Sequence, residues 1–233
     1  MKITERQGKL LNVIVKEYID SAQPVSSQLL EKKYDFSISP ATIRIEMQKL
    51  TDKGFLLQPH TSAGRVPTDK GYRFFVNNLL EKESKGSNGI EDWLGKDVED
   101  TFKFVQSLTK HIAKTTRALT LSYLEGEDLF WTEGWEEVLK EPEFEERDFL
   151  LNFTIFLRVF ENHIDELKDD SDINVYIGKE NPLPKAKDFA VISFRYRLPN
   201  GEEGVISILG PKRMEYDKNI NLINSLTKLL DNF

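Results

Sequence analysis

A serine and a proline at positions 39 and 40, and a glycine at position 54, bound the stretch that most constrains this chain. The Ser39 side chain can accept hydrogen bonds from the free N–H groups of a first helical turn, and Pro40 suits the first helical position because its φ is already helical. Gly54 supplies the residue that helices often need just past their last turn. These signals predict a helix that begins after Ser39 and ends before Gly54.

The predicted helix has two different faces. Ile43, Met47 and Leu50 recur at helical spacing, so we expect them to share one buried stripe. The opposite face is small, polar and basic with one apolar exception, and it carries Ala41, Arg44, Ile45, Gln48 and Lys49. A buried stripe behind a basic outward face is typical of a helix that enters the major groove of DNA.

A hairpin is predicted directly after this helix. Residues 55–58 form a short apolar run suited to a strand, and two prolines enclose a tip of small residues that contains His60, Thr61 and Ser62. Gly64 gives the turn its permissive residue. Arg65 beside it is placed to meet a phosphate or to enter a minor groove.

Helices are predicted on both sides of this region. Thr4 and Gln7 have the spacing of a capping box, Ser26 or Ser27 caps a short second helix, and Thr68 caps a helix after the hairpin. Three helices followed by a hairpin in this length are the winged helix-turn-helix arrangement, whose third helix binds in the major groove.

The charge is divided unevenly along the chain. The net charge of −7 argues by itself against a nucleic-acid partner. Residues 1–80, however, hold 12 Lys and Arg against 8 Asp and Glu, net +4, which leaves 20 against 31, net −11, for residues 81–233. A basic module joined to an acidic one is expected of a DNA-binding protein whose second domain stays off the DNA.

The second half is predicted to be α+β around an antiparallel sheet. Residues 81–91 are charged and small and form the predicted linker, so domains are expected at 1–80 and 92–233. Helices are predicted from about Asp92 toward Arg117, from Glu145 to about Leu167 and from Asp217 to Leu230. Strands are predicted at 119–124, 173–177, 189–198 and 204–210, the last two joined by a loop at Asn200-Gly201 that is longer than a tight turn.

Several stretches resemble the HrcA family of heat-inducible transcription repressors. SPATIRIEMQKL and QPHTSAGRVPTDKGYRFFV resemble the family's N-terminal winged helix, and residues 134–144, 177–181 and 204–216 resemble the later part of its GAF-like domain. Family members usually carry an inserted dimerisation module between the counterparts of Tyr123 and Phe130, where this chain has only a short turn. The resemblance therefore implies a short form with a reduced GAF-like domain of antiparallel sheet and flanking helices.

The resemblance also implies a function. It points to a repressor that binds an inverted-repeat operator before chaperone genes and releases it on heat shock. An inverted repeat requires two copies of the domain, so a homodimer is expected. In the family a chaperonin helps to maintain the active repressor and is an expected partner. Without a signal-peptide core, a membrane-length apolar run or any cysteine, the expected compartment is the cytoplasm.

Individual DNA contacts follow from side-chain chemistry. Arg44 can pair with guanine or clamp a phosphate, and Gln48 can read adenine. Ser39, Thr42 and Lys49 can hold phosphates. The alternative for the two cations, Arg44 and Lys49, is that they only solvate the helix.

Other residues leave alternatives open. The family usually places asparagine at the position of Ile45, so Ile45 either packs on a thymine methyl group or marks an altered operator. His60 either contacts the DNA backbone or has the structural role that is commoner for a lone histidine in a turn. Trp131 and Trp135 either line a ligand pocket or, as is commoner, pack in the core.

No enzyme, cofactor or metal site is predicted. The sequence has no phosphate loop, dinucleotide fingerprint, nucleophile elbow or zinc helix motif, and the acidic run at residues 169–172 lacks the glycine and distal glutamate of an EF-hand loop. The alternative of a different class is a ligand-sensing or protein-interaction module whose winged helix does not bind DNA.

Overall fold

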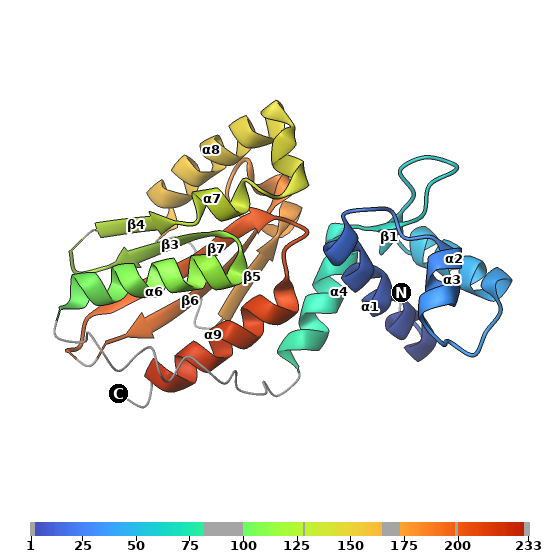
Figure 1. Cartoon of the computed structure of the whole chain (residues 1–233), viewed down its shortest axis with the longest axis horizontal. Coiled ribbons are helices and arrows are strands. Elements are labelled where there is room, and N and C mark those ends of the chain that lie inside the picture. Colours follow the sequence, from blue (N-terminus) through green and yellow to red (C-terminus); the bar gives the residue numbers. More distant parts are fainter. Residues whose placement is uncertain (1–2, 82–99, 128, 165–172, 199, 231–233) are drawn as a thin grey trace. The chain divides into compact units, whose positions relative to one another are not determined.

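The computed structural model describes residues 3–81, 100–127, 129–164, 173–198 and 200–230. The chain divides into two compact units, Met1–Glu81 and Lys82–Phe233, coloured blue to teal and green to red in Figure 1. Apart from Glu81, the predicted linker lies outside the described residues, as does the acidic run at 169–172. In the part of the chain that is described, no helix is both long enough and apolar enough to cross a membrane.

The first unit combines helices with a short two-stranded ribbon. Its elements are α1 (Glu5–Ser21), α2 (Ser27–Lys33), α3 (Pro40–Asp52), β1 (Leu56–Leu57), β2 (Val66–Pro67) and α4 (Asp69–Leu80). The two strands are antiparallel, with Leu56 opposite Pro67 and Leu57 opposite Val66. The predicted hairpin after the third helix is therefore confirmed.

Local hydrogen bonds explain where these helices begin. Thr4 and Gln7 form the predicted capping box, each side chain accepting from the other residue's backbone N–H at 3.2 Å. Ser26, not Ser27, caps α2, and Thr68 caps α4 by accepting from the first turn. These starts depend on residues a few positions apart, which is why the sequence predicted them.

The core of the first unit lies between α1, α3 and α4. α1 packs against both α3 and α4, and α2 packs against α3. Fully buried side chains include Leu10, Leu11, Ile14, Val15, Leu30, Leu50 and Val76. The buried Glu17 carboxylate joins α1 to the end of α2, because it accepts from Lys33 Nζ at 2.6 Å and from the Tyr34 hydroxyl. Burial and this carboxylate raise the pKa of Tyr34 to about 12.

The second unit is built on a five-stranded antiparallel sheet. Its strands are β3 (Leu119–Leu124), β4 (Leu129–Glu133), β5 (Ile173–Ile177), β6 (Phe189–Arg197) and β7 (Glu203–Pro211), in the order β4-β3-β7-β6-β5. Its helices are α6 (Thr101–Thr116), α7 (Trp135–Val138), α8 (Arg147–Asn162) and α9 (Tyr216–Leu230), with 3-10 turns η1 (Pro142–Glu145), η3 (Gly178–Glu180) and η4 (Ala186–Asp188). The predicted mixture of helices with an antiparallel sheet is confirmed.

Helices cover both faces of this sheet. On one face the α8 rings pack on the strands, and Phe156 stacks on Phe189 of β6 with ring centroids 5.1 Å apart. On the other face α6 lies along β3, where the buried hydroxyls of Thr109 and Ser122 are 2.6 Å apart. Neighbouring residues of a strand point to opposite faces. Leu121 therefore faces the α8 side of the sheet, and Ser122 faces α6.

Some predictions for this unit need adjustment. α6 begins at Thr101 with Asp100 as its cap, later than the predicted start near Asp92, and residues 92–99 lie outside the described residues. β4 was not assigned as a strand, yet it pairs with β3 from end to end. The loop between β6 and β7 is longer than a two-residue turn, as predicted, with Leu198 N–H donating to the Glu202 carbonyl at 2.8 Å.

Trp131 and Trp135 both pack against aromatic neighbours. Trp135 meets Phe153 edge-on with ring centroids 6.0 Å apart, and Phe153 belongs to the main core cluster. Trp131 lies 6.0 Å from the Phe102 ring of α6. For Trp135 the structure supports the core-packing alternative.

Candidate nucleic-acid interface

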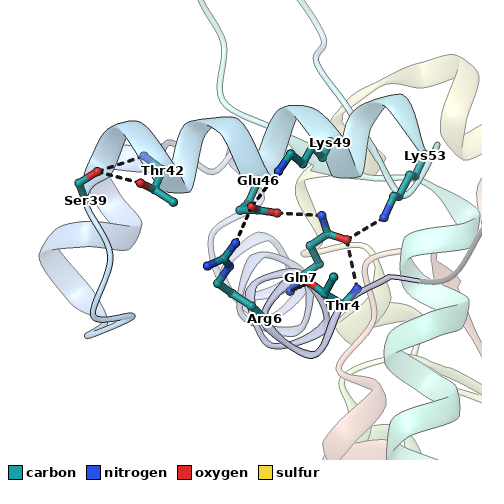
Figure 2. Close-up of polar contacts among 8 residues, drawn as sticks. All are labelled: Thr4, Arg6, Gln7, Ser39, Thr42, Glu46, Lys49 and Lys53. Atoms are coloured by element: carbon teal, nitrogen blue, oxygen red, sulfur yellow. Dashed lines mark hydrogen bonds and ion pairs between the residues drawn. The ribbon is translucent and has the colours of Figure 1, made fainter.

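The start and end of α3 are fixed by neighbouring residues. The Ser39 hydroxyl accepts from the Thr42 backbone N–H at 3.2 Å, and the two hydroxyls lie 3.0 Å apart (Figure 2). Pro40 occupies the first helical position, and Lys53 follows the last one. Gly54 comes next with a φ of 75°, so the predicted helix limits are confirmed.

α3 buries one face and exposes the other. Ile43, Met47 and Leu50 are at most 3% exposed, which confirms the predicted buried stripe. Ile45 is 54% exposed, although isoleucine is usually found inside proteins. The exposed side chains of the outward face are Ala41, Arg44, Ile45, Gln48 and Lys49.

The two predicted cations of this face have different surroundings. Lys49 Nζ lies 3.1 Å from the Glu46 carboxylate, and this ion pair partly neutralises the charge of Lys49. Arg44 forms no hydrogen bond or ion pair with any residue that the structure describes. All donors of the Arg44 guanidinium are therefore available to an anion or a base edge.

A buried carboxylate joins α3 to the first turn of α1. Glu46 is 2% exposed, and Figure 2 shows its carboxylate between Arg6 Nη2 at 2.8 Å and Gln7 Nε2 at 2.7 Å. Lys53 Nζ donates to Gln7 Oε1 at 2.8 Å, so this cation lies beside the same cluster. The contacts orient α3 against α1 and place Arg6 and Lys53 next to the helix.

The contacts of Glu46 with Gln7, Lys49 and Arg6 also determine whether its carboxyl group is ionised. The hydrogen bond from Gln7, together with Lys49 and Arg6, lowers the pKa of the Glu46 carboxyl from its ordinary value, although burial acts in the opposite direction. The carboxylate is held ionised, with cations offsetting its charge. An unpaired carboxylate here would repel phosphates.

Arg6 was missed by the sequence-based prediction of the site. The capping pattern of Thr4 and Gln7 predicts where α1 begins, but it carries no information about which helix that first turn contacts. The only local signal that Arg6 belongs to the site is its place as a basic residue in the first turn of a helix, and this signal is weak.

The tip of the ribbon is an exposed, closed turn. His60, Thr61 and Ser62 are exposed, and the Ala63 N–H donates to the His60 carbonyl at 2.9 Å. The Gln58 side chain donates to the Thr61 carbonyl at 2.9 Å and to the Ala63 carbonyl at 3.0 Å. One side chain thus holds the tip together and leaves its polar residues free to face a partner.

Gly64 has a different role from the one predicted. Its φ is not positive, so the left-handed region is not what requires glycine here. The adjacent Arg65 backbone exchanges two hydrogen bonds with Val25, at 2.8 and 2.9 Å, and a Cβ atom on Gly64 would lie 2.3 Å from the Val25 carbonyl oxygen. The glycine permits the ribbon to lie against the segment between α1 and α2.

The structure corrects the predicted placement of Arg65. The residue is only 9% exposed, and its guanidinium points to α3 and not outward. Nε donates to Thr51 Oγ1 at 3.0 Å, and Nη2 donates to Gln48 Oε1 at 2.9 Å. In this conformation Arg65 is not free to meet a phosphate or to enter a minor groove, because its donors are directed at the helix.

Comparison with known proteins identifies relatives along the whole chain. Residues 73–220 match the family described as HrcA protein C terminal domain. The heat-inducible transcription repressor HrcA of Thermoanaerobacter sp. (strain X514) is 29% identical, with 100% of this chain and 97% of that protein covered. That alignment runs over 335 positions, against 233 residues here, so many positions of the relative have no counterpart in this chain.

A second relative is more similar over a shorter stretch. The heat-inducible transcription repressor HrcA of Alkaliphilus metalliredigens (strain QYMF) is 45% identical over 120 residues, which are 52% of this chain and 35% of that protein. The names of these relatives are those of a transcription repressor and not of an enzyme.

One solved structure has the same fold. A crystal structure of a hypothetical protein at 2.2 Å resolution matches with a TM-score of 0.86 at 22% sequence identity, covering 99% of this chain and 98% of that chain. The family match spans more than half of the chain. The chain therefore belongs to the HrcA family.

Proposed function

We propose that this protein is a DNA-binding transcription repressor of heat-shock genes. Residues 1–80 would form a winged helix-turn-helix domain, with α3 as the recognition helix and the β1–β2 ribbon as the wing. The observation that carries the proposal is the outward face of α3, where Arg44 and Ile45 are exposed and which the ribbon residue Arg65 contacts through Gln48. The relatives named as heat-inducible transcription repressors support the same function.

The dimensions of α3 suit a major groove. A helix of 13 residues is about 20 Å long, and the groove is about 12 Å wide, enough to admit one helix. Its capped N-terminus adds a partial positive charge that favours phosphates. Ser39 and Thr42 lie at this end and are the proposed phosphate ligands there, together with Lys49 farther along the helix.

The exposed side chains have distinct proposed roles. Arg44, with its uncommitted guanidinium, pairs with guanine or clamps a phosphate. Ile45 packs on a thymine methyl group or marks an operator different from that of other family members. Ala41 permits close approach to the bases, and His60, Thr61 and Ser62 meet the DNA backbone from the ribbon tip.

The second unit has the proposed role of pairing two DNA-binding domains. Its antiparallel sheet with helices on both faces suits a GAF-like domain, for which we propose residues 92–233. An inverted-repeat operator requires a two-fold arrangement, so the functional form is a homodimer. The short β3–β4 connection leaves no room for an inserted module at that point, and pairing must use another surface. Chaperone genes as targets and a chaperonin as partner are carried over from the family.

A DNA-binding titration at two salt concentrations tests the function. The full-length chain is mixed with an inverted-repeat duplex from a chaperone promoter and with a random duplex of equal length. We expect tighter binding to the repeat and a steep loss of affinity at the higher salt concentration. Arg44→Ala should weaken binding at least tenfold, whereas Arg197→Ala, a control at an exposed cation of the second unit, should not.

One outcome would overturn the proposed DNA binding, and another would overturn the proposed homodimer. A folded chain that binds neither duplex at low salt would favour the alternative in which the N-terminal unit docks a protein. Sedimentation of the complex tests the homodimer, because two chains per duplex are expected. A stable complex of one chain per inverted repeat would contradict the proposed pairing.

A further inference from the structure

The ribbon carries a buried cation whose partners are neutral. The Arg65 guanidinium is bonded to the Thr51 hydroxyl and the Gln48 amide oxygen, and within the described residues no carboxylate pairs with it. Burying an unpaired charge is costly unless hydrogen bonds compensate for the lost water. A residue held at this cost beside the outward face of α3 calls for a reason beyond closing the ribbon, since the Arg65 backbone already pairs with Val25.

The Gln48 side chain is held at both ends of its amide. Its oxygen accepts from Arg65 Nη2 at 2.9 Å, and its nitrogen donates to Asp52 Oδ1 at 2.8 Å. A free glutamine on a helix surface rotates about three side-chain bonds, and ordering it costs free energy when it binds. Here Gln48 is exposed, but two hydrogen bonds hold its amide, so less of this cost remains to be met on binding.

The two hydrogen bonds use half of the amide's capacity. A glutamine amide has two N–H donors and two acceptor lone pairs, so one of each remains after Arg65 and Asp52 are satisfied. One donor and one acceptor on neighbouring atoms are what the major-groove edge of adenine requires, because adenine offers the N7 acceptor and the N6 amino donor. The network therefore leaves Gln48 with the chemistry for a bidentate contact to adenine.

We propose that Arg65 is a positioning residue that sets base specificity through Gln48 without touching DNA. The inference rests on the proposed DNA-binding function and adds to it the residue that orders the base-reading side chain. Arg65 links the ribbon to α3, so the position of the ribbon and the orientation of Gln48 are coupled. The loss of Arg65 then acts on one base position of the operator and not on overall attraction to DNA.

The test is a selection from duplexes whose inverted half-sites are randomised, using the full-length chain and its variants. For the wild type we expect adenine to be preferred at one position of each half-site. Gln48→Ala and Arg65→Met should both reduce that preference, by roughly tenfold, at the same position. The double variant should lose no more than either single variant, because both changes remove one interaction.

A second measurement separates positioning from direct phosphate contact. If Arg65 only positions Gln48, the dependence of the binding constant on salt concentration is the same for Arg65→Met and the wild type. If Arg65 contacts a phosphate, Arg65→Met weakens binding to all duplexes alike and lowers the salt slope by about 1. The second result would overturn the inference and leave the proposed function standing.

A milder variant tests the inference if Arg65→Met fails to fold. Asp52 is exposed and holds the other end of the amide, so Asp52→Ala loosens Gln48 without changing a buried residue. We expect it to weaken the adenine preference at the same position while leaving the thermal unfolding of the chain unchanged. If Arg65→Met unfolds and Asp52→Ala has unaltered specificity, the inference is wrong. A wild-type chain that binds no duplex overturns both the proposed function and this inference.

Discussion

Gln7 Nε2 donates a 2.7 Å hydrogen bond to Glu46 Oε2 across the buried contact between α1 and α3. The carboxylate also accepts from Arg6, and Lys49 lies beside it. The helix proposed to enter DNA is therefore oriented by charged and polar contacts as well as by its apolar stripe. Polar contacts of this kind can be broken one at a time.

Replacing Glu46 by glutamine should destabilise the first unit. Glu46→Gln removes the charge that Arg6 and Lys49 face, and its amide group brings donors toward them. We expect the free energy of unfolding to fall by about 1–3 kcal/mol. Hydrogen exchange of the α3 amides measures this, since all three tryptophans lie in the second unit and do not report on the first. The control is Glu31→Gln at an exposed residue, where a loss of equal size would contradict the explanation.

The same carboxylate predicts a dependence of stability on pH. The folded-state pKa of Glu46 lies below its ordinary value of 4.5, so its contribution is fully present above that value and is lost as the pH falls through the folded pKa. Stability of α3 should therefore decrease below about pH 4.5 more steeply in the wild type than in Glu46→Gln. Hydrogen exchange in the two chains between pH 7 and pH 3 checks this, and parallel pH profiles would exclude the predicted role of Glu46.

An added methyl group on Gly64 should disrupt the ribbon. Gly64→Ala places a Cβ atom 2.3 Å from the Val25 carbonyl oxygen. The backbone fixes the position of the Cβ atom, and the oxygen belongs to the backbone, so no side-chain rotation can relieve the clash. We expect a loss of roughly 2–4 kcal/mol in stability and weaker binding to the operator duplex. Gly126→Ala is the matched control, because nothing lies within 4 Å of its Cβ position. Equal unfolding temperatures of the two variants would contradict the prediction, because they would mean that the ribbon shifts to accommodate the methyl group.

The exposed Ile45 offers a direct test of how the operator is read. A contact with a thymine methyl group is lost when that thymine is replaced by deoxyuridine, which lacks the methyl. If Ile45 makes the contact, the substitution should weaken wild-type binding several-fold and leave Ile45→Ala unaffected. Because Ile45 is exposed, Ile45→Ala should change stability by less than about 0.5 kcal/mol. Equal sensitivity of both chains to deoxyuridine would favour the alternative that Ile45 marks an altered operator.

The second unit contains a buried arginine whose removal should be severe. Arg213 has an 8% exposed side chain and donates to Glu141 and to both oxygens of Glu143, at 2.8 and 3.0 Å for the latter. Arg213→Met leaves these carboxylates without their cation, and we expect a loss of about 3 kcal/mol. Tryptophan fluorescence during urea unfolding measures it. Arg197→Ala, at a largely exposed ion pair, should cost less than about 1 kcal/mol, so similar losses in both variants would refute the difference in burial as the cause.

The parts of the fold that the sequence predicted are those decided by near neighbours. Ser39 and Thr68 cap helices through residues three positions away, and the apolar spacing of α3 fixes its buried face. Strand pairing between β6 and β7 follows from two apolar runs joined by a short loop. Such features need no knowledge of the rest of the chain.

What the sequence did not predict depends on contacts between distant residues. Arg65 was expected to face DNA because it follows a turn, but its side chain meets Gln48 and Thr51 through packing that no local pattern encodes. Gly64 is required by the Val25 carbonyl, 39 positions earlier in the sequence. Arg6 joins the site only because α1 lies against α3. In each case the residue type could be read from the sequence, but the residue that it contacts could not.

The contact of Gly64 with Val25 also limits how relatives of this chain can vary. An insertion between Gly64 and Pro67 would shift the ribbon against both β1 and Val25, whereas added residues between Gln58 and Ala63 would change the tip and its Gln58 hydrogen bonds but neither strand pairing nor the Val25 contact. A protein that evolves toward a different length of DNA contact can therefore extend the reach of its ribbon without moving the recognition helix.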